Sequence, residues 1–374
     1  MSGAQSQLWL NDERRGQWPM AVLFYCNTRW IQYVSGSRDK KSKTVADLVA
    51  MLFELSEMQA NLKTPSQRLL VIKHGALGDI VQGFGAFASL RAGHPDAHIA
   101  LLTTAPFVEL AHMMPWFDEV LIDRRAGVLH LQESWRMRKL IRNNWDMIVD
   151  LQCSQRTGRY FQFFARPNKR WIGTAAGCSD PCPDFTGVNN RQRMRIAAEM
   201  AGGAEAVHDM GWLFDQAAPR PVPGATKPYA VLVPGCSLAK PQKRWPAKNF
   251  AALARKCHED NISVMLTGTT ADRDVIEMVQ SLAPDAINLC GQTSIADLAR
   301  LTASAEFVVG NDTGPVFLAA ATGAPTIMVM GPDTNPEMSA PTGPRCDWVR
   351  ATPISNVSID DVGGALQRLT SKPV

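Results

Sequence analysis

Apolar positions along this chain fall into short continuous runs that alternate with segments of helical spacing. LLVIK at residues 69–73 and HIALLTT at residues 98–104 have the character of buried strands, and each is followed by a segment with helical spacing of its apolar residues. Strands that alternate with helices in this way predict an α/β protein with parallel sheets.

The alternation occurs in two series that a proline-rich stretch separates. The first series predicts a doubly wound domain over residues 67–214, the stretch at 215–228 predicts a linker, and the second series predicts another such domain over residues 229–374. Two doubly wound sheets joined in this way bring the carboxyl ends of their strands to a central cleft, where α/β folds bind ligands. The expected strands lie at 69–73, 98–104, 119–123, 147–152, 169–173, 229–235, 262–268, 286–291, 307–309 and 326–331. The expected helices lie at 80–91, 107–113, 131–143, 191–201, 249–260, 272–282, 295–303 and 359–370.

Residues 1–66 fit poorly with this pattern. They offer a short strand at 20–25, a basic loop at 35–42 and helical spacing at 44–62. The segment is either an appended helical extension or sequence that precedes a true start, and the pattern does not choose between the two.

Composition narrows the class of protein. With 45% hydrophobic and 20% charged residues among 374, the chain has the balance of a soluble globular protein of two domains. A net charge of +4 gives no overall electrostatic case for nucleic acid. Eight scattered cysteines lack the spacing of a disulfide framework, and Cys178 and Cys182 have no second Cys or His pair for zinc, so reduced thiols are expected.

No apolar run reaches the roughly 18 residues that span a bilayer, and the first residues do not have the pattern of a secretory signal. We therefore expect a cytoplasmic protein, and peripheral contact with the inner membrane stays open.

The segment VVGNDTGPVFLAAAT holds the first candidate site. An apolar strand ends at Val309, residues 310–311 break it, and Asp312 or Thr313 can then cap a helix of small residues. Free backbone N–H groups at a helix start attract phosphate, and Gly314 lets a diphosphate approach the backbone closely. The alternative is an ordinary strand-to-helix turn.

Two further loops of the second series carry polar residues after strands. The turn PGCS contains Gly235 and Ser237, and KPQKRWP places three cations around Lys243 just before a helix. Cations near such a turn would neutralise a diphosphate, although a solvated charge run is the alternative.

In the first series, Asp79 follows Gly78 at a helix start, where the helix dipole favours its ionised form and it could accept a proton. The alternative is that Asp79 serves only as an N-cap. His74 is a second candidate base or a pocket residue. Neither a dinucleotide fingerprint nor a Walker loop follows the strands, and no Asp-x-Asp or histidine cluster suits a catalytic metal.

The motifs LLVIKHGALGDIV, PGCS with KRWP, LTGTTADRD, NLCGQTSIADLARL and VVGNDTGPVFLAAATGAPTIMVMGPDTNPEMSAP occur in order over residues 67–370. Together they resemble glycosyltransferase family 9, the ADP-heptose:lipopolysaccharide heptosyltransferases. The resemblance implies a GT-B architecture of two Rossmann-like domains, and an inverting transfer that uses no metal and no cofactor apart from the ADP-sugar donor. The implied partners are this donor and a lipopolysaccharide-core or other glycan acceptor, without nucleic acid.

The resemblance also assigns roles to residues. It implies that Asp79 is the base, that Lys243 stabilises the diphosphate and that Asp272 contacts the nucleoside ribose. The remaining implied contacts with diphosphate and sugar are Gly78, Gly235, Ser237, Asp312, Thr313, Gly314 and Phe317, and those with the nucleoside are Thr267 and Gly268.

At Phe317 the chain differs from the family that it resembles, because the resemblance implies a histidine at this position. An apolar ring cannot donate a hydrogen bond to the diphosphate, so Phe317→His should raise transfer unless the ring packs the domain core. The departure leaves two alternatives to the transferase open: a catalytically weak nucleotide-sugar-binding homologue, and a sugar-nucleotide epimerase of the same architecture.

Overall fold

The computed structural model describes residues 21–26, 29–34, 67–127, 130–166, 169–207, 210–214, 228–237 and 240–370. The chain divides into two compact units, Met1–Thr64 and Pro65–Val374. In the first unit, β1 (Ala21–Cys26) pairs antiparallel with β2 (Arg29–Val34), and β1 covers most of the strand expected at 20–25. The loop expected at 35–42, the helix expected at 44–62 and the linker residues 215–227 lie outside the described residues.

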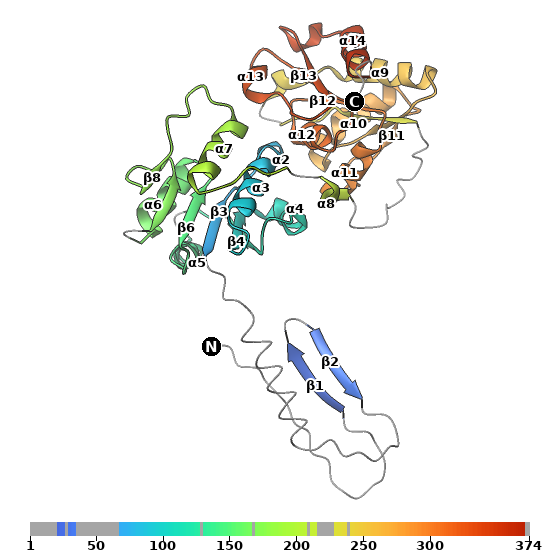
Figure 1. Ribbon diagram of the computed structural model, residues 1–374. Coiled ribbons are helices and arrows are strands. Elements are labelled where there is room, and N and C mark those ends of the chain that lie inside the picture. The colour runs from blue at the N-terminus through green and yellow to red at the C-terminus, as the bar shows by residue number, and fades with distance from the viewer. Residues whose placement is uncertain are drawn as a thin grey trace, which may run out of the picture. The chain divides into compact units, whose positions relative to one another are not determined.

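The second unit contains two six-stranded sheets whose neighbouring strands all run parallel (Figure 1). The strand orders are β5-β4-β3-β6-β7-β8 and β11-β10-β9-β12-β13-β14. Both orders reverse beside the first strand of the sheet, which confirms the doubly wound prediction and puts the ligand-binding position near β3 and β9. The strands of the first sheet are β3 (Arg68–Ile72), β4 (His98–Thr103), β5 (Glu119–Ile122), β6 (Met147–Asp150), β7 (Arg170–Gly173) and β8 (Asp180–Pro181). Those of the second are β9 (Tyr229–Val233), β10 (Ser263–Leu266), β11 (Ile287–Asn288), β12 (Phe307–Asn311), β13 (Thr326–Met330) and β14 (Cys346–Arg350).

Helices follow the strands of both sheets. We call residues 68–200 the N-terminal lobe and residues 229–370 the C-terminal lobe. The helices of the first lobe are α2 (Leu77–Val81), α3 (Phe84–Gly93), η1 (Ala105–Phe107), α4 (Val108–Met113), α5 (Leu131–Ile141), α6 (Gln155–Phe164) and α7 (Asn190–Met200), and α8 (Gly211–Phe214) comes next. Those of the second are η2 (Pro241–Lys243), α9 (Ala247–Glu259), η3 (Thr270–Asp272), α10 (Arg273–Leu282), α11 (Ile295–Ala303), α12 (Gly314–Ala321), α13 (Pro336–Ser339), η4 (Ile354–Asn356) and α14 (Ile359–Thr370).

The alternation of side chains along β3 separates two layers of helices in the N-terminal lobe. Leu69 and Val71 join a buried cluster with residues of α3 and α7, whereas Leu70 and Ile72 join one with residues of α5 and α6. Because both faces of the strand are covered, every position from 69 to 72 is apolar and fully buried.

The structure differs from the expected elements in several places. The helix expected at 80–91 is two helices, α2 and α3, with Gly83 before the second. Neither α6 nor β14 was expected, although a capping box between Ser154 and Thr157 begins α6. The strand expected to end at Val309 continues through Gly310 and Asn311. A Cβ atom at Gly310 would lie 2.7 Å from Cβ of Val233, so this glycine serves close packing inside the sheet and does not break the strand.

Candidate active site

Asp79 lies at the start of α2, after the loop that follows β3. It is the third residue of this helix and Ala76 is the N-cap, so the alternative that Asp79 is an N-cap is wrong. The half-buried Asp79 accepts a hydrogen bond at Oδ1 from Nδ2 of Asn190 at 3.0 Å. Nη2 of Arg193 donates to Oδ1 of that asparagine at 2.7 Å. Since an arginine can only donate, this bond fixes the Asn190 amide with its NH2 group toward Asp79.

Lys73 is a buried cation in the same part of the lobe, directly after β3, with 2% of its surface exposed. Burial lowers the pKa of its ammonium group, and the nearby carboxylate of Asp79 acts in the opposite direction. The carboxyl group of Asp150 is 1% exposed, and burial raises its pKa. Two buried ionisable groups, Lys73 and Asp150, therefore lie in the same lobe as Asp79, and neither was expected to belong to the site.

In the C-terminal lobe, Lys243 and Asp312 form an ion pair. Lys243 is the last residue of η2, Asp312 follows β12, and the ammonium group contacts Oδ2 of the carboxylate. Oγ1 of Thr334 donates to the same oxygen at 2.9 Å. The side chain of Asp312 is therefore paired with a cation and does not cap α12. The side chain of Thr313, the N-cap residue, makes no capping hydrogen bond either. The expected side-chain cap is therefore wrong. Pro315 has no N–H, and the N–H of Val316 donates to the carbonyl of Thr313 at 3.0 Å, so an acceptor at the start of α12 would meet the N–H of Gly314.

Asn311 ties the loops of this lobe together. Its side chain is fully buried; Oδ1 accepts from the backbone N–H of Trp245 at 2.8 Å, and Nδ2 donates to the carbonyl of Pro234 at 2.8 Å. The amide thus holds the KRWP loop against the turn that contains Gly235. This residue was expected only to end a strand.

The expected nucleoside residues lie beside Gly235. A Cβ atom at this glycine would lie 2.4 Å from the carboxylate of Asp272, and one at Gly268 would lie 3.1 Å from Cβ of Asp272. Both N and Oγ1 of Thr269 donate to Oδ2 of Asp272 at 2.9 Å, so this carboxylate caps η3. Thr267 is 1% exposed, and within the described part of the chain its hydroxyl has no hydrogen-bond partner. Ser237 is exposed at the end of this turn.

The two lobes meet where α2 contacts α12. A Cβ atom at Gly314 would lie 2.7 Å from Cβ of Leu77 and 3.0 Å from the backbone N of Gly78. A Cβ atom at Gly78 would in turn lie 2.8 Å from the ring of Phe317. Two glycines therefore allow the α2 turn, which carries Asp79, to lie directly against the start of α12.

Phe317 is part of this contact. Its surface is 7% exposed, and it belongs to a buried apolar cluster that contains residues of both lobes. The ring thus packs between the lobes, where an imidazole would have to replace its contact with Gly78.

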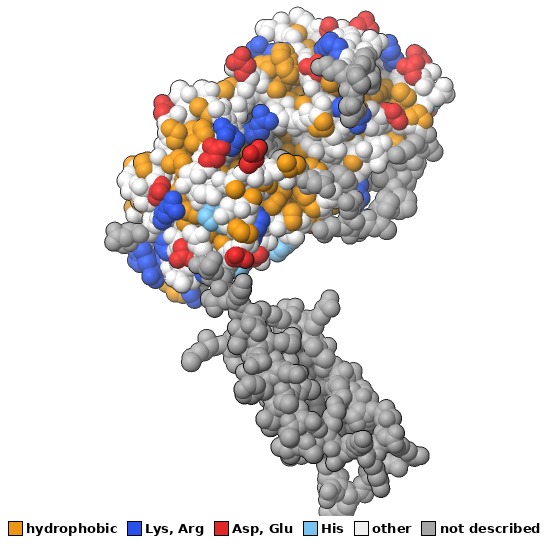
Figure 2. Space-filling model, viewed as in Figure 1, with side chains coloured by type: hydrophobic (Ala, Val, Ile, Leu, Met, Phe, Trp, Pro, Cys, Tyr) orange, Lys and Arg blue, Asp and Glu red, His pale blue; other side chains and the backbone are white. Residues whose placement is uncertain are grey.

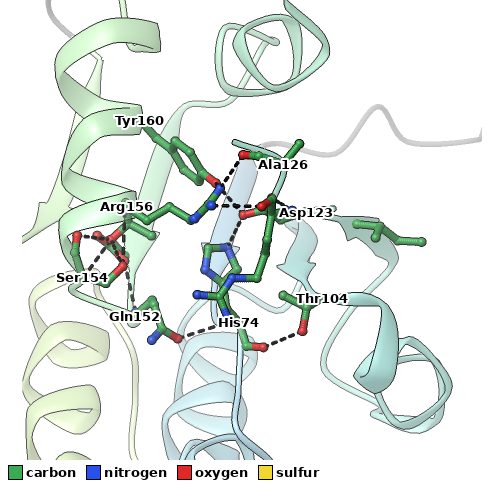
Figure 3. A network of polar contacts seen from close by, with 12 residues as sticks. His74, Thr104, Asp123, Ala126, Gln152, Ser154, Arg156 and Tyr160 are labelled. Carbon is green, nitrogen blue, oxygen red and sulfur yellow. Dashed lines mark hydrogen bonds and ion pairs between the residues drawn. The ribbon is translucent and has the colours of Figure 1, made fainter. Parts of the chain in front are cut away.

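His74 belongs to a buried polar network on the other side of the β3 loop (Figure 3). Its Nε2 lies 3.1 Å from Oδ2 of Asp123, and the hydroxyl of Tyr160 donates to the same oxygen at 2.5 Å. Nη1 of Arg156 donates to that hydroxyl at 3.1 Å. The backbone of His74 is held as well, because its N–H donates to Oε1 of Gln152 at 3.0 Å. His74 is therefore a buried residue held in place, joined to the ends of β5 and β6 and to α6.

Asp123 is ionised in this network. Burial alone would raise the pKa of its carboxyl group, but the close contact with His74 and hydrogen bonds from Tyr160 and the backbone N–H of Arg125 outweigh burial and lower the pKa to about 2. Burial and the neighbouring carboxylate raise the pKa of Tyr160, so its hydroxyl keeps its proton and donates.

Asp123 and Tyr160 were not among the expected site residues, although each left a signal in the sequence. Asp123 ends the expected strand EVLID, and a polar residue at the carboxyl end of a parallel strand is a site candidate. The cap Ser154 begins α6, which carries Tyr160, but the capping box closes with Thr157 instead of the usual Glu or Gln.

Known proteins resemble this chain in sequence and in fold. The model of glycosyltransferase family 9 (heptosyltransferase) matches residues 189–358. The lipooligosaccharide heptosyltransferase 2 of Haemophilus ducreyi is 26% identical over 312 residues, which cover 76% of this chain and 88% of that protein. The lipopolysaccharide heptosyltransferase 1 of Pseudomonas aeruginosa is 24% identical, covering 74% of this chain and 81% of that protein. Among solved structures, E. coli heptosyltransferase WaaC with ADP superposes with a TM-score of 0.67 at 20% identity, over 80% of this chain and 99% of that one.

Two doubly wound sheets with loops that meet between them define a GT-B architecture. Over residues 189–358 the chain resembles glycosyltransferase family 9, and the heptosyltransferases of Haemophilus ducreyi and Pseudomonas aeruginosa named above are relatives at 26% and 24% identity.

Proposed function

We propose that this protein is a glycosyltransferase that moves a heptose, or a related sugar, from an ADP-sugar to a lipopolysaccharide inner-core acceptor with inversion at the anomeric carbon. The observation that carries the proposal is the contact between α2 and α12, which joins the loop of Asp79 to the helix start beside Lys243 and Asp312. The printed names of the relatives support the sugar and the acceptor, because they are lipopolysaccharide and lipooligosaccharide heptosyltransferases. The ADP in the WaaC structure supports the nucleotide.

The proposed mechanism is a single displacement. The acceptor hydroxyl oxygen forms a bond to the anomeric carbon while the bond from that carbon to the diphosphate oxygen breaks, and ADP leaves with the electron pair. Asp79 takes the hydroxyl proton, and Asn190 holds its carboxylate in place during the transfer. Lys243 and the N–H of Gly314 at the start of α12 meet the charge that grows on the leaving phosphate. For this, Lys243 divides its ammonium group between Asp312 and the diphosphate.

We also propose that the reaction needs neither a metal nor a cofactor beyond the donor. Among the described residues, no group of three or more His, Cys, Asp and Glu side chains is suited to a metal ion. Transfer should therefore be unchanged in excess EDTA, and loss of transfer that added Mg²⁺ restores would contradict this part of the proposal.

The proposed partners are the nucleotide-sugar and a glycan acceptor, and not nucleic acid. The proposed location is the cytoplasm, at the inner membrane where a lipid-linked acceptor is made. In the part of the chain that the structure describes, no helix has the length and apolar character required to cross a bilayer.

The test is transfer of radiolabelled sugar from ADP-heptose to a lipopolysaccharide-core acceptor. A transferase labels the acceptor, whereas a nucleotide-sugar-binding homologue leaves it unlabelled and an epimerase changes only the free donor. Thermal shift with ADP, UDP and GDP tests the nucleotide separately, since a ligand of the folded state raises Tm. We expect ADP to give the largest shift, and a clear preference for UDP or GDP would contradict the heptosyl assignment.

A further inference from the structure

The basic residues of this chain are concentrated in one part of the N-terminal lobe. Residues 124–170 contain eleven Lys and Arg against three Asp and Glu, a surplus of eight cations, whereas the whole chain has a surplus of only four. The rest of the protein therefore has more acidic than basic residues. Such a local surplus attracts an anionic partner to one region of the surface.

Helix α5 presents part of this charge on a single exposed face. Leu131, Trp135, Arg138 and Lys139 recur at helical spacing and are all exposed, whereas Met137 and Ile141 are buried against the sheet. The exposed fractions of Leu131 and Trp135 are 78% and 66%, which is unusual for large apolar side chains. The ammonium group of Lys139 lies 5.6 Å from the ring centroid of Trp135. Cations and apolar side chains thus share one surface.

Helix α6 contacts α5 and repeats the pattern. Arg159 and Phe163 are exposed, Phe163 by 66%, and Arg166 is exposed just beyond the helix end. In Figure 2, basic side chains gather at the end of the N-terminal lobe where Figure 1 labels α5 and α6. We define the α5–α6 face as Leu131, Trp135, Arg138, Lys139, Arg159, Phe163 and Arg166.

The cations of the α5–α6 face are not neutralised. Within the described ranges, no carboxylate lies in ion-pair distance of Arg138, Lys139, Arg159 or Arg166. Glu133, the only acidic residue of α5, is occupied by Arg124 and Arg136. The face therefore has a net positive charge that a partner must meet.

A pocket of about 360 Å³ opens between the two helices. Its lining combines three arginines (Arg136, Arg156 and Arg159) and two carboxylates (Asp123 and Glu133) with apolar groups such as Met137, Phe163 and Phe164. A lining of both kinds suits an amphipathic molecule with an anionic group and an apolar part better than it suits a nucleic acid backbone, which offers no apolar chain.

We propose that the α5–α6 face docks on a bilayer of anionic phospholipids, with the cations on the headgroups and with Leu131, Trp135 and Phe163 in the interface. Each Lys or Arg near an anionic membrane surface contributes binding, and exposed Trp and Phe insert at the headgroup level. The inference concerns lipid and is independent of which sugar the protein transfers.

The experiment is sedimentation of the full-length protein with extruded vesicles. Vesicles of phosphatidylethanolamine with phosphatidylglycerol are compared with vesicles of phosphatidylcholine alone, at about 0.1 M and 0.5 M salt. Neither donor nor lipopolysaccharide is present. We expect binding to the anionic vesicles at low salt and its loss at high salt, because screening shortens the reach of charge.

Two double variants test the face, each with a matched control on the other lobe. The double variant Arg138→Glu with Lys139→Glu should weaken vesicle binding at least ~30-fold, because each lost cation costs roughly fivefold. Its control is Lys248→Glu with Lys256→Glu, which changes two exposed cations of α9 and should bind as wild type. Trp135→Ser with Phe163→Ser should weaken binding on the order of tenfold, and the controls are Trp348→Ser with Met278→Ser, exposed by 40% and 57%. A Tm within a few degrees of wild type shows that each variant is folded.

Three results would overturn the proposal: wild-type protein that stays in the supernatant with anionic vesicles, equal binding to phosphatidylcholine, and face variants that bind like their controls. Tighter binding to duplex DNA than to the vesicles would identify a nucleic acid surface instead and would also overturn it. Failure of sugar transfer leaves vesicle binding unaffected, so the two proposals fail separately.

Discussion

Nδ2 of Asn190 donates a hydrogen bond to Oδ1 of Asp79 at 3.0 Å, across 111 positions of the sequence. The bond joins the first residue of α7 to the turn of α2, and Arg193 fixes its direction from the far side of the amide. Within the described part of the chain, Oδ2 of Asp79 has no hydrogen-bond partner, so this oxygen is the one available to an acceptor hydroxyl.

Asp79→Asn should lower kcat by ~100-fold to ~10,000-fold, the usual cost of losing a general base, and leave donor affinity nearly unchanged. Single-turnover transfer together with ADP titration measures the two effects. Asp96→Asn, an exposed carboxylate of the same lobe, is the control. A D79N enzyme within threefold of wild type would remove Asp79 from this role.

Asn190→Ala should lower kcat by roughly tenfold with little change in the KM of the donor, because the carboxylate loses its orientation while donor contacts stay. The matched control is Asn189→Ala. The side chain of Asn189 caps α7 by accepting from N of Gln192, so this change should cost about 1 kcal/mol of stability without a loss of kcat. If both variants lose stability and neither loses turnover, Asn190 is structural only.

Lys243→Ala should weaken both donor binding and turnover, since its cation meets charge that increases in the transition state. The variant also leaves Asp312, which is 8% exposed, with Thr334 as its remaining side-chain partner. Asp312→Asn separates the two effects, because it frees Lys243 while retaining the cation. Donor titration and kcat for both variants, with Lys248→Ala as the control, decide the role. A fall in Tm alone for Lys243→Ala would make the lysine structural.

Phe317→His should lower Tm and leave transfer no higher than in wild type. The ring is 7% exposed and packs on Gly78, and a smaller, more polar ring there gives up apolar contact and needs a hydrogen-bond partner. Phe317→Leu, which keeps an apolar side chain, should lose less stability. Higher transfer in Phe317→His would instead support the expectation from the family resemblance that position 317 faces the diphosphate.

Acid should destabilise the protein through Asp123. The pKa of this carboxyl group is about 2 in the folded protein, below its ordinary value of 3.8, so its contribution to stability is complete above about pH 4 and is lost as pH falls toward 2. A shift of this size corresponds to about 2 kcal/mol.

Urea unfolding between pH 5 and pH 2.5 measures this loss. Tyr160→Phe, which removes the hydroxyl that donates to Asp123, should make the decline over this range shallower. Asp96→Asn should leave the decline unchanged, and an equal slope in wild type and Tyr160→Phe would contradict the role of this hydrogen bond.

The sequence predicted most strands of both sheets because strands buried on both faces leave continuous apolar runs, as at residues 69–72. The same criterion failed for β14, where only Val349 is buried in CDWVR. Helix α6 was missed because glycine, arginine and glutamine interrupt its apolar residues. Family motifs indicated Asp79 and Lys243 as site residues, since each lies in a local pattern. The role of Asn190 could not be predicted, because it depends on a contact between distant segments. Asp123 could be singled out as a polar residue at the end of a strand, but its pairing with His74 could not.

The contact among Gly78, Gly314 and Phe317 has a consequence for chimaeras between this protein and its relatives. Gly78 comes from one lobe and the other two residues from the second, so an exchange of a whole lobe separates side chains that fit by size. A foreign C-terminal lobe would bring a different residue against Gly78, and the α2 turn with Asp79 would move with the new contact. Chimaeras that exchange α2 together with α12 should therefore keep more activity than those cut between the lobes, and positions 78 and 317 should change together during evolution.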